Sequence, residues 1–190
     1  MNNTAKLFVF SAPSGSGKTT IVRKLLREFN DLVFSISATT RKRRGVEVDG
    51  KDYFFISEDE FKQKIENNEF IEWEKFYDYY YGTLKSFVED HLQHNKSVLL
   101  EVDVKGALRI KKKYKNAVLI FIAPPSKEIL KERLINRKTE SEKDLQKRIE
   151  RAEMELEYKD KFDYVVINNE LESAIEEVKA IIKNEIINQE

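Results

Sequence analysis

Short, continuous runs of apolar residues recur along the chain and alternate with segments whose apolar positions follow a helical spacing. The clearest runs are residues 7–10 (LFVF), 98–102 (VLLEV), 117–123 (AVLIFIA) and 164–168 (YVVIN). Runs of this length are typical of strands that are buried on both faces, as in a parallel sheet. The pattern therefore predicts an α/β fold with a parallel sheet and helices on both of its faces.

Two helices can be placed from their apolar positions. Between residues 21 and 29, directly after the first run and a short loop, apolar side chains follow intervals of three and four residues. Near the C-terminus, apolar residues between Leu171 and Ile182 share one helical face. The chain is therefore predicted to begin with a strand–loop–helix unit and to close with a helix.

Residues 35–83 interrupt this alternation. The segment 46–53 contains Asp49-Gly50, a dipeptide that is typical of a β-hairpin turn. A short helix is predicted at 58–68. We expect a small inserted α+β subdomain here.

Residues 126–158 form a second interruption, which is rich in charge. It contains a narrow apolar stripe formed by Leu145, Ile149, Ala152 and Leu156. Its arginines fall at helical spacing in two pairs, Arg133 with Arg137 and Arg148 with Arg151. The pattern fits a solvated helical hairpin, or a mobile lid whose arginines contact phosphate. Residues 1–34, 84–125 and 159–190 are left as the core.

Composition narrows the classes of function. The chain has 190 residues, and its 34 basic and 34 acidic side chains cancel, which argues against nucleic-acid binding. It contains no cysteine and only two histidines, His91 and His94, too few for a zinc site. The apolar run at 7–10 is too short for a signal peptide, and no run approaches a membrane span. We expect a cytoplasmic protein with no membrane or nucleic-acid partner, as a monomer or homodimer.

The clearest chemical motif is SAPSGSGKTT, residues 11–20, between the first strand and the first helix. It fits the phosphate-binding loop pattern G-x-x-x-x-G-K-[ST], except that Ala12 replaces the first glycine. In such a loop Gly15 and Gly17 allow the tight backbone, Lys18 reaches the outer phosphates, and the Thr19 hydroxyl can bind Mg²⁺. Alanine is acceptable at position 12 if its φ is negative. The motif predicts binding of a nucleoside triphosphate with Mg²⁺.

A phosphate-binding loop does not by itself define the reaction. Residues 103–106 (DVKG) match the D-x-x-G pattern of GTPases, but residues 95–98 (NKSV) lack the aspartate of the guanine-reading N-K-x-D motif. The pattern thus disfavours a GTPase. The basic run 41–44 (RKRR) could also be a localisation or nucleic-acid patch, which the zero net charge disfavours.

Six further stretches add specificity. They are 34–45 (FSISATTRKRRG), 49–55 (DGKDYFF), 68–73 (NEFIEW), 80–83 (YYGT), 101–106 (EVDVKG) and 121–126 (FIAPPS). With the phosphate-binding loop and in this order, the chain resembles the guanylate kinase family over nearly its whole length. The resemblance implies a P-loop core, a GMP-binding insertion at 35–83 and a lid at 126–158. It also implies transfer of the γ-phosphate of ATP to GMP or dGMP, giving ADP and GDP.

The resemblance also implies roles for individual residues. Those expected around GMP are Ser37, Arg41, Arg44, Tyr53, Glu72, Tyr81, Gly82, Thr83 and Asp103. Those expected around ATP are Ala12, Pro13, Ser14, Gly15, Ser16, Gly17, Lys18, Thr19, Thr20, Arg137 and Asn168, with Asn168 beside the adenine. Those expected to neutralise charge in the reaction are Lys18, Arg41, Arg133, Arg137 and Arg148. Thr19 and Glu101 are expected to hold Mg²⁺, partly through water.

The chemistry of the acceptor residues agrees with these roles. Guanine presents N1–H and N2–H₂ donors, which the carboxylates of Glu72 and Asp103 can accept, whereas adenine would leave a carboxylate unpaired. The hydroxyls of Ser37 and Thr83 can donate to O6. Arg41 and Arg44, with Tyr53 and Tyr81, can bind the GMP phosphate.

Two other interpretations stay open. The chain could be a guanylate-kinase-like binding module, although such a module does not need Lys18 and Thr19. It could also be a kinase for another monophosphate, such as AMP or UMP, which Glu72 and Asp103 disfavour. The sequence departs from the family at Ala12, in the absence of glycines around Arg137, and at Asn169, where an aspartate is common.

Overall fold

The molecule is built on a five-stranded parallel sheet. The computed structural model describes residues 5–76, 78–136 and 142–187. The strands are β1 (Leu7–Ser11), β2 (Leu32–Phe34), β7 (Ser97–Glu101), β8 (Val118–Ala123) and β9 (Tyr164–Ile167), in the order β2-β7-β1-β8-β9. The four predicted apolar runs are all strands of this sheet, which confirms the predicted class. The prediction that the fourth run is buried on both faces is wrong, because β9 is an edge strand on which Val165 and Ile167 are exposed. The short strand β2 was not predicted.

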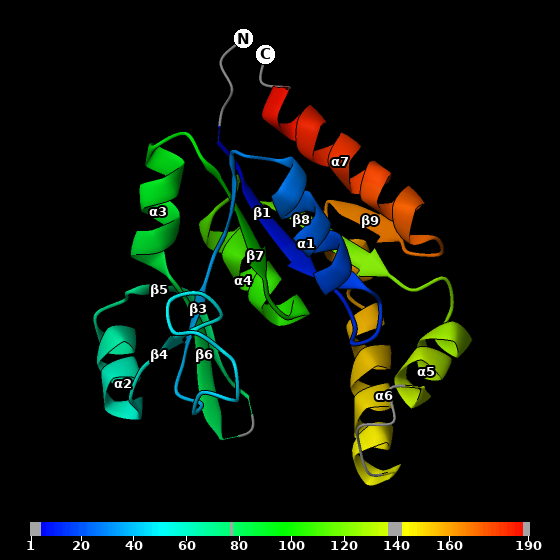
Figure 1. Ribbon diagram of the computed structural model, residues 1–190, viewed down its shortest axis with the longest axis horizontal. Coiled ribbons are helices and arrows are strands. Elements are labelled where there is room, and N and C mark those ends of the chain that lie inside the picture. The colour runs from blue at the N-terminus through cyan, green and yellow to red at the C-terminus, as the bar shows by residue number, and fades with distance from the viewer. Residues whose placement is uncertain (1–4, 77, 137–141, 188–190) are drawn as a thin grey trace.

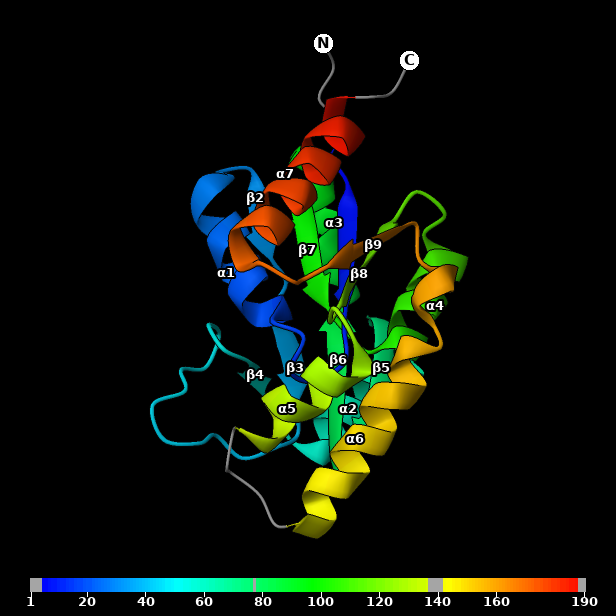
Figure 2. The same cartoon turned by 90° about the vertical axis from the view of Figure 1, so that its right-hand side faces the viewer.

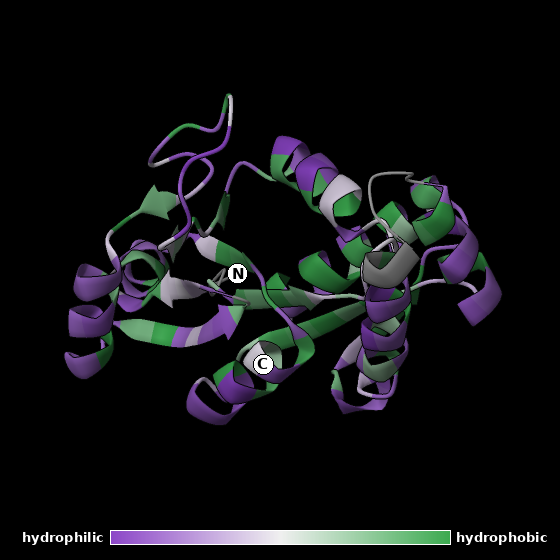
Figure 3. Cartoon of the chain, turned by 90° about the horizontal axis from the view of Figure 1, so that it is seen from below, coloured by the Kyte–Doolittle hydropathy of each residue, from purple (hydrophilic) through white to green (hydrophobic). Residues whose placement is uncertain are grey.

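Helices cover both faces of the sheet (Figure 1). Helices α1 (Lys18–Glu28) and α7 (Leu171–Ile187) pack on one face, and α3 (Lys85–Gln93) and α4 (Val104–Lys113) pack on the other. Along β1, Phe8 and Phe10 face α1 and α7, while Leu7 and Val9 face α3 and α4. Every residue of β1 is therefore buried, which explains its uninterrupted apolar run. Green, hydrophobic positions gather on the strands in Figure 3, and purple ones on the outer faces of the helices.

A second, smaller sheet lies beyond one end of the parallel sheet (Figure 1). It contains β3 (Ser37–Thr39), β4 (Phe54–Phe55), β5 (Phe70–Phe76) and β6 (Tyr79–Leu84), in the order β4-β3-β6-β5. Helix α2 (Glu58–Glu66), which confirms the helix predicted here, buries Phe61 against Ala38 and Phe70. Ser57 caps this helix by accepting a hydrogen bond from the Glu60 N–H.

The hairpin predicted around Asp49-Gly50 is wrong. Gly50 has the expected positive φ of 73°, but only an isolated bridge joins Asp49 to Tyr53 and no paired strands flank the turn. Acidic side chains take the backbone donors instead: Asp52 accepts from the Val48 N–H and Asp49 from the Phe55 N–H. Such local bonds compete with strand pairing and close a compact loop.

Residues 126–158 contain a helical hairpin, as predicted, formed by α5 (Lys127–Ile135) and α6 (Glu142–Leu156) (Figure 2). The predicted apolar stripe of α6 packs on Leu130 and Leu134 of α5. A short 3₁₀ turn, η1 (Lys159–Lys161), then leads into β9. In the described part of the chain, no helix is both long and apolar enough to span a membrane.

Candidate functional site

The loop after β1 has the backbone of a phosphate-binding loop. Gly15 and Gly17 both have φ near +90°, the left-handed region that favours glycine, and α1 begins at Lys18. Ala12 is not among the described residues with positive φ, and it packs against the core formed with α1 and α7. The alanine is therefore compatible with the loop, because the conformational demand falls on Gly15 and Gly17.

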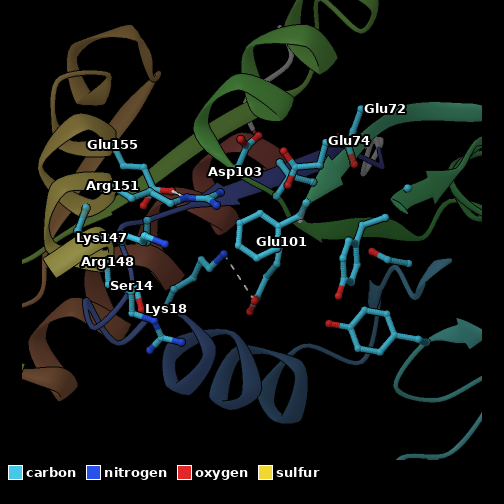
Figure 4. A pocket seen from close by; sticks show the side chains of 18 residues that line it. Ser14, Lys18, Glu72, Glu74, Glu101, Asp103, Lys147, Arg148, Arg151 and Glu155 are labelled. Atoms are coloured by element: carbon cyan, nitrogen blue, oxygen red, sulfur yellow. Dashed lines mark hydrogen bonds and ion pairs between the residues drawn. The ribbon is translucent and has the colours of Figure 1, made fainter. Parts of the chain in front are cut away.

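This loop forms one end of a pocket of about 500 Å³ (Figure 4). Lys18 projects into the pocket, and its Nζ lies 3.7 Å from Oε2 of Glu101 at the end of β7. The Lys18 ammonium and the N-terminus of α1 together make this end of the pocket suited to anions.

Asn168, which follows β9, supports the loop from behind. Its buried side-chain amide donates a hydrogen bond of 2.7 Å to the Ser16 carbonyl. A Cβ at position 17 would lie only 2.3 Å from this amide, so Gly17 is required by packing as well as by φ. Arg133 of α5 donates to the Asn168 carbonyl at 3.2 Å. The structure therefore places Arg133 and Asn168 beside the loop, although neither lines the pocket.

The opposite end of the pocket holds a buried carboxylate. Glu72 of β5 is 8% exposed, and β-sheet pairing sets it opposite Thr83, which is in turn opposite Ser37. The Thr83 hydroxyl donates to Oε1 of Glu72 at 3.4 Å, and the Arg109 guanidinium lies 3.6 Å from Oε2. Burial raises the pKa of Glu72 to about 7, although Arg109 opposes the rise. A site built in this way favours a ligand that donates hydrogen bonds to the carboxylate.

Asp103 lies next to this carboxylate at the start of α4. One of its oxygens caps the helix by accepting from the Gly106 N–H at 2.6 Å. Glu74, two residues after Glu72 on the same face of β5, also points into the pocket (Figure 4). Burial and the neighbouring Asp103 raise the pKa of Glu74 to about 7.

Arg41 lies at the edge of this end of the pocket and is 6% exposed. Its guanidinium makes a bidentate pair with Glu47, with N···O distances of 2.7 and 3.0 Å, and stacks near the rings of Tyr53 and Phe55. The bond to Arg41 lowers the pKa of Glu47. Arg41 is therefore held as a cation in a fixed orientation.

The structure brings many of the predicted residues together and leaves others at the margin. The predicted residues that line the pocket are Ala12, Ser14, Lys18, Ser37, Tyr53, Glu72, Tyr81, Gly82, Glu101, Asp103 and Arg148. Arg44 is exposed, and its backbone N–H donates to Glu47. Thr19 and Thr20 are exposed on the first turn of α1. Arg137 lies outside the described residues.

Several residues that line the pocket were not predicted to do so from the sequence: Glu74, Phe76, Lys147, Arg151 and Glu155. The alternation of β5 could have placed Glu74 and Phe76 on the same face as Glu72. The i, i+3 and i, i+4 spacing in α6 could likewise have grouped Arg148, Arg151 and Glu155. Nothing in the sequence indicated that these two faces meet.

The doubly covered parallel sheet and the glycine-supported loop before α1 define an α/β P-loop nucleotide-binding protein. The family model described as "Guanylate kinase" matches residues 4–185. The chain belongs to the guanylate kinase family.

Curated relatives and solved structures agree with this family. The chain is 50% identical to the guanylate kinase of Thermotoga maritima over 180 residues, which cover 95% of this chain and 87% of the relative. It is 52% identical to that of Caldanaerobacter subterraneus over 176 residues, covering 93% and 85%. The crystal structure of guanylate kinase from Anaplasma phagocytophilum superposes with a TM-score of 0.79 at 30% identity, and the match covers 98% of this chain and 89% of that one.

Proposed function

We propose that the protein transfers the γ-phosphoryl group of ATP to GMP or dGMP, giving ADP and GDP. One observation carries the proposal beyond family membership: a single pocket has the Lys18 ammonium at one end and the buried carboxylate of Glu72 at the other. The first end suits a triphosphate, and the second suits a base that donates hydrogen bonds.

Guanine would bind against Glu72 and Asp103. Its N1–H and N2–H₂ groups would donate to the carboxylates, while the hydroxyls of Ser37 and Thr83 would donate to O6. Adenine has no such pair of donors and would leave a buried carboxylate unpaired, which costs about 1–3 kcal/mol. GMP would therefore be preferred over AMP for two reasons: guanine forms hydrogen bonds with the carboxylates, and adenine leaves a buried carboxylate without a partner.

The phosphate of GMP would be bound by Arg41 and Arg44, with the phenol groups of Tyr53 and Tyr81. The rings of Tyr53 and Tyr81 lie 6.1 Å apart, edge to face, beside the Arg41 guanidinium. Arg44 is the exposed member and would have to turn inward on binding.

ATP would bind through the loop 12–20, with its phosphates on the backbone N–H groups and Lys18. Among the described residues, no three acidic or imidazole side chains are grouped in a way that could hold a metal ion. The Thr19 hydroxyl and the Glu101 carboxylate at the loop still fit Mg²⁺, which binds through few protein ligands together with substrate phosphates and water. When bound, the ion would neutralise charge on those phosphates.

The acceptor phosphate oxygen is already nucleophilic, so the residues need to position and neutralise rather than to act as a strong base. Lys18, Arg148 and Arg133 would act on the donor side, and Arg41 on the acceptor side. We propose the same role for Arg137. Residues 126–158 would act as a lid, whose closure excludes water that could otherwise hydrolyse ATP.

A coupled assay of ADP formation with GMP, dGMP, AMP, CMP and UMP as acceptors tests the proposal. We expect GMP and dGMP to be strongly preferred. Comparable rates with AMP would contradict the base-reading role of Glu72 and Asp103. No turnover with any monophosphate would instead favour a binding module, and Lys18 argues against that alternative.

A further inference from the structure

Arg151 enters the pocket from α6 and is anchored there by its own helix. Its Nε donates to Oε1 of Glu155, one turn further along, at 3.0 Å. Glu155 is 7% exposed, so the guanidinium is fixed by a buried carboxylate. Figure 4 shows the pair projecting from α6 toward Asp103.

The far side of Arg151 contacts the other wall of the pocket. Its guanidinium carbon lies 4.4 Å from the centroid of the Phe76 ring, at the end of β5, within the range of a cation–π contact. Glu74, on the same face of β5, also feels this cation, because Arg151 opposes the rise in the pKa of Glu74 that burial and Asp103 cause. Arg151 therefore contacts an aromatic face across the pocket and acts on the charge of a nearby carboxyl group.

The apolar contacts of α6 are made elsewhere. Leu145, Ile149 and Ala152 pack with α5, and Leu156 also touches the core of the parallel sheet. These contacts hold the hairpin together and attach it to the core of the parallel sheet. The contact of Arg151 with Phe76 connects two segments 75 residues apart in sequence, and it lies where the two walls face each other.

We propose that Arg151 is a positioning residue that couples the α5–α6 hairpin to the small sheet: docked on Phe76, it holds the two walls of the pocket together during phosphoryl transfer. The inference rests on the proposed function, since it treats the small sheet as the GMP-binding part and the hairpin as the lid. Loss of the contact loosens closure. It therefore weakens GMP binding at the β5 wall and admits water to the donor phosphates.

The test compares Arg151→Gln, Phe76→Leu and the double variant with the wild type. The measured quantities are kcat, KM for GMP, KM for ATP, and the ratio of ADP to GDP formed. We expect each single variant to raise KM for GMP by about three- to tenfold, the scale of one cation–π contact. We also expect KM for ATP to change less and the ADP to GDP ratio to rise above that of the wild type.

Two variants serve as controls. Lys131→Gln removes one positive charge from the same hairpin, at an exposed ion pair between Lys131 and Glu153 of 3.0 Å, and should behave as the wild type. Arg151→Gln also removes the hydrogen-bond partner of the buried Glu155. Phe76→Leu is therefore measured as well, because it removes the cation–π contact and leaves the Arg151–Glu155 pair intact. A purely structural role would lower the unfolding temperature without changing the ADP to GDP ratio.

The double variant gives the sharpest result. If Arg151 acts through Phe76, the two effects on KM combine less than multiplicatively, and urea unfolding of the unliganded proteins shows the same coupling. The inference would be overturned if the effects of the two substitutions were independent both on KM and on urea unfolding. It would also be overturned if the ADP to GDP ratio of the Arg151 and Phe76 variants equalled that of Lys131→Gln. Failure of the wild type to phosphorylate GMP would refute the proposed function instead, while the unfolding cycle would still test the contact.

Discussion

Replacing Glu72 by glutamine should make the protein more stable at pH 8 and a poorer kinase. Burial raises the pKa of Glu72 from the ordinary 4.5 to about 7. At 1.36 kcal/mol per pKa unit, keeping this carboxyl ionised in the fold costs about 3 kcal/mol. A buried glutamine amide that is incompletely paired costs about 1 kcal/mol of its own, so the net gain should be about 2 kcal/mol.

The pH dependence follows from the direction of the shift. The pKa of Glu72 is about 7 in the folded protein and 4.5 in the unfolded chain. Between these two pH values, the folded protein keeps a proton on Glu72 that the unfolded chain has released. Stability from this group is therefore complete below pH 4.5 and is lost as the pH rises to about 7. The pKa of Glu74 is also raised to about 7, and the charge of Glu74 helps to raise the pKa of Glu72. The stability difference between the wild type and Glu72→Gln therefore reports Glu72 together with its interaction with Glu74.

Urea unfolding at pH 5 and pH 8 measures this difference, with Glu66→Gln on the exposed face of α2 as a charge-matched control. The advantage of Glu72→Gln should be small at pH 5 and about 2 kcal/mol at pH 8. In the same variant, kcat/KM for GMP should fall about 10- to 100-fold, the value of a hydrogen bond to a charged group. An advantage that is equal at both pH values, or a variant less stable at pH 8 than the wild type, would refute the reasoning.

Three further predictions concern the loop and the small sheet. Lys18→Ala should lower kcat by about 10²-fold, as expected for one lost charge contact in the transition state, and a near-normal rate in steady-state assays would exclude that role. Ala12→Gly should lower the free energy of unfolding by about 0.5–1 kcal/mol and leave KM for ATP within about twofold, since φ is not positive there; a large change in KM would contradict this. Gly82→Ala should destabilise the protein by about 1–3 kcal/mol, because the new Cβ would lie 2.8 Å from Phe70 and 2.9 Å from Phe61; an unchanged unfolding midpoint would show that both rings can move.

Much of the fold could be predicted because its signals are local. Strands buried on both faces are apolar at nearly every position, so β1, β7 and β8 were visible without any tertiary information. The run of β9 was visible in the same way, although β9 is an edge strand on which Val165 and Ile167 are exposed. The phosphate-binding loop was equally visible, because Gly15 and Gly17 supply a conformation that few other residues adopt. The residues proposed around GMP could be inferred only from the resemblance to a family. Without it, Glu72 cannot be distinguished from an ordinary glutamate on a strand.

The hairpin predicted at Asp49-Gly50 is wrong, because the Asp-Gly dipeptide indicates a turn but does not show whether the flanking residues pair as strands. The side chains of Asp49 and Asp52 satisfy the backbone donors that strand pairing would have used. In the same way, the pairing of Arg41 with Glu47 depends on the path of this loop, which the sequence did not reveal.

The sequence by itself determined four strands of the parallel sheet, the phosphate-binding loop and the two helices of the hairpin, because each depends on residues close together in the chain. Only the tertiary structure decided what surrounds each charge. Burial, Arg109 and Thr83 set the pKa of Glu72, and Arg151 faces Phe76 across the pocket. Electrostatic energies depend on distance and solvent exposure in three dimensions, and neither quantity can be read from residues so far apart in sequence.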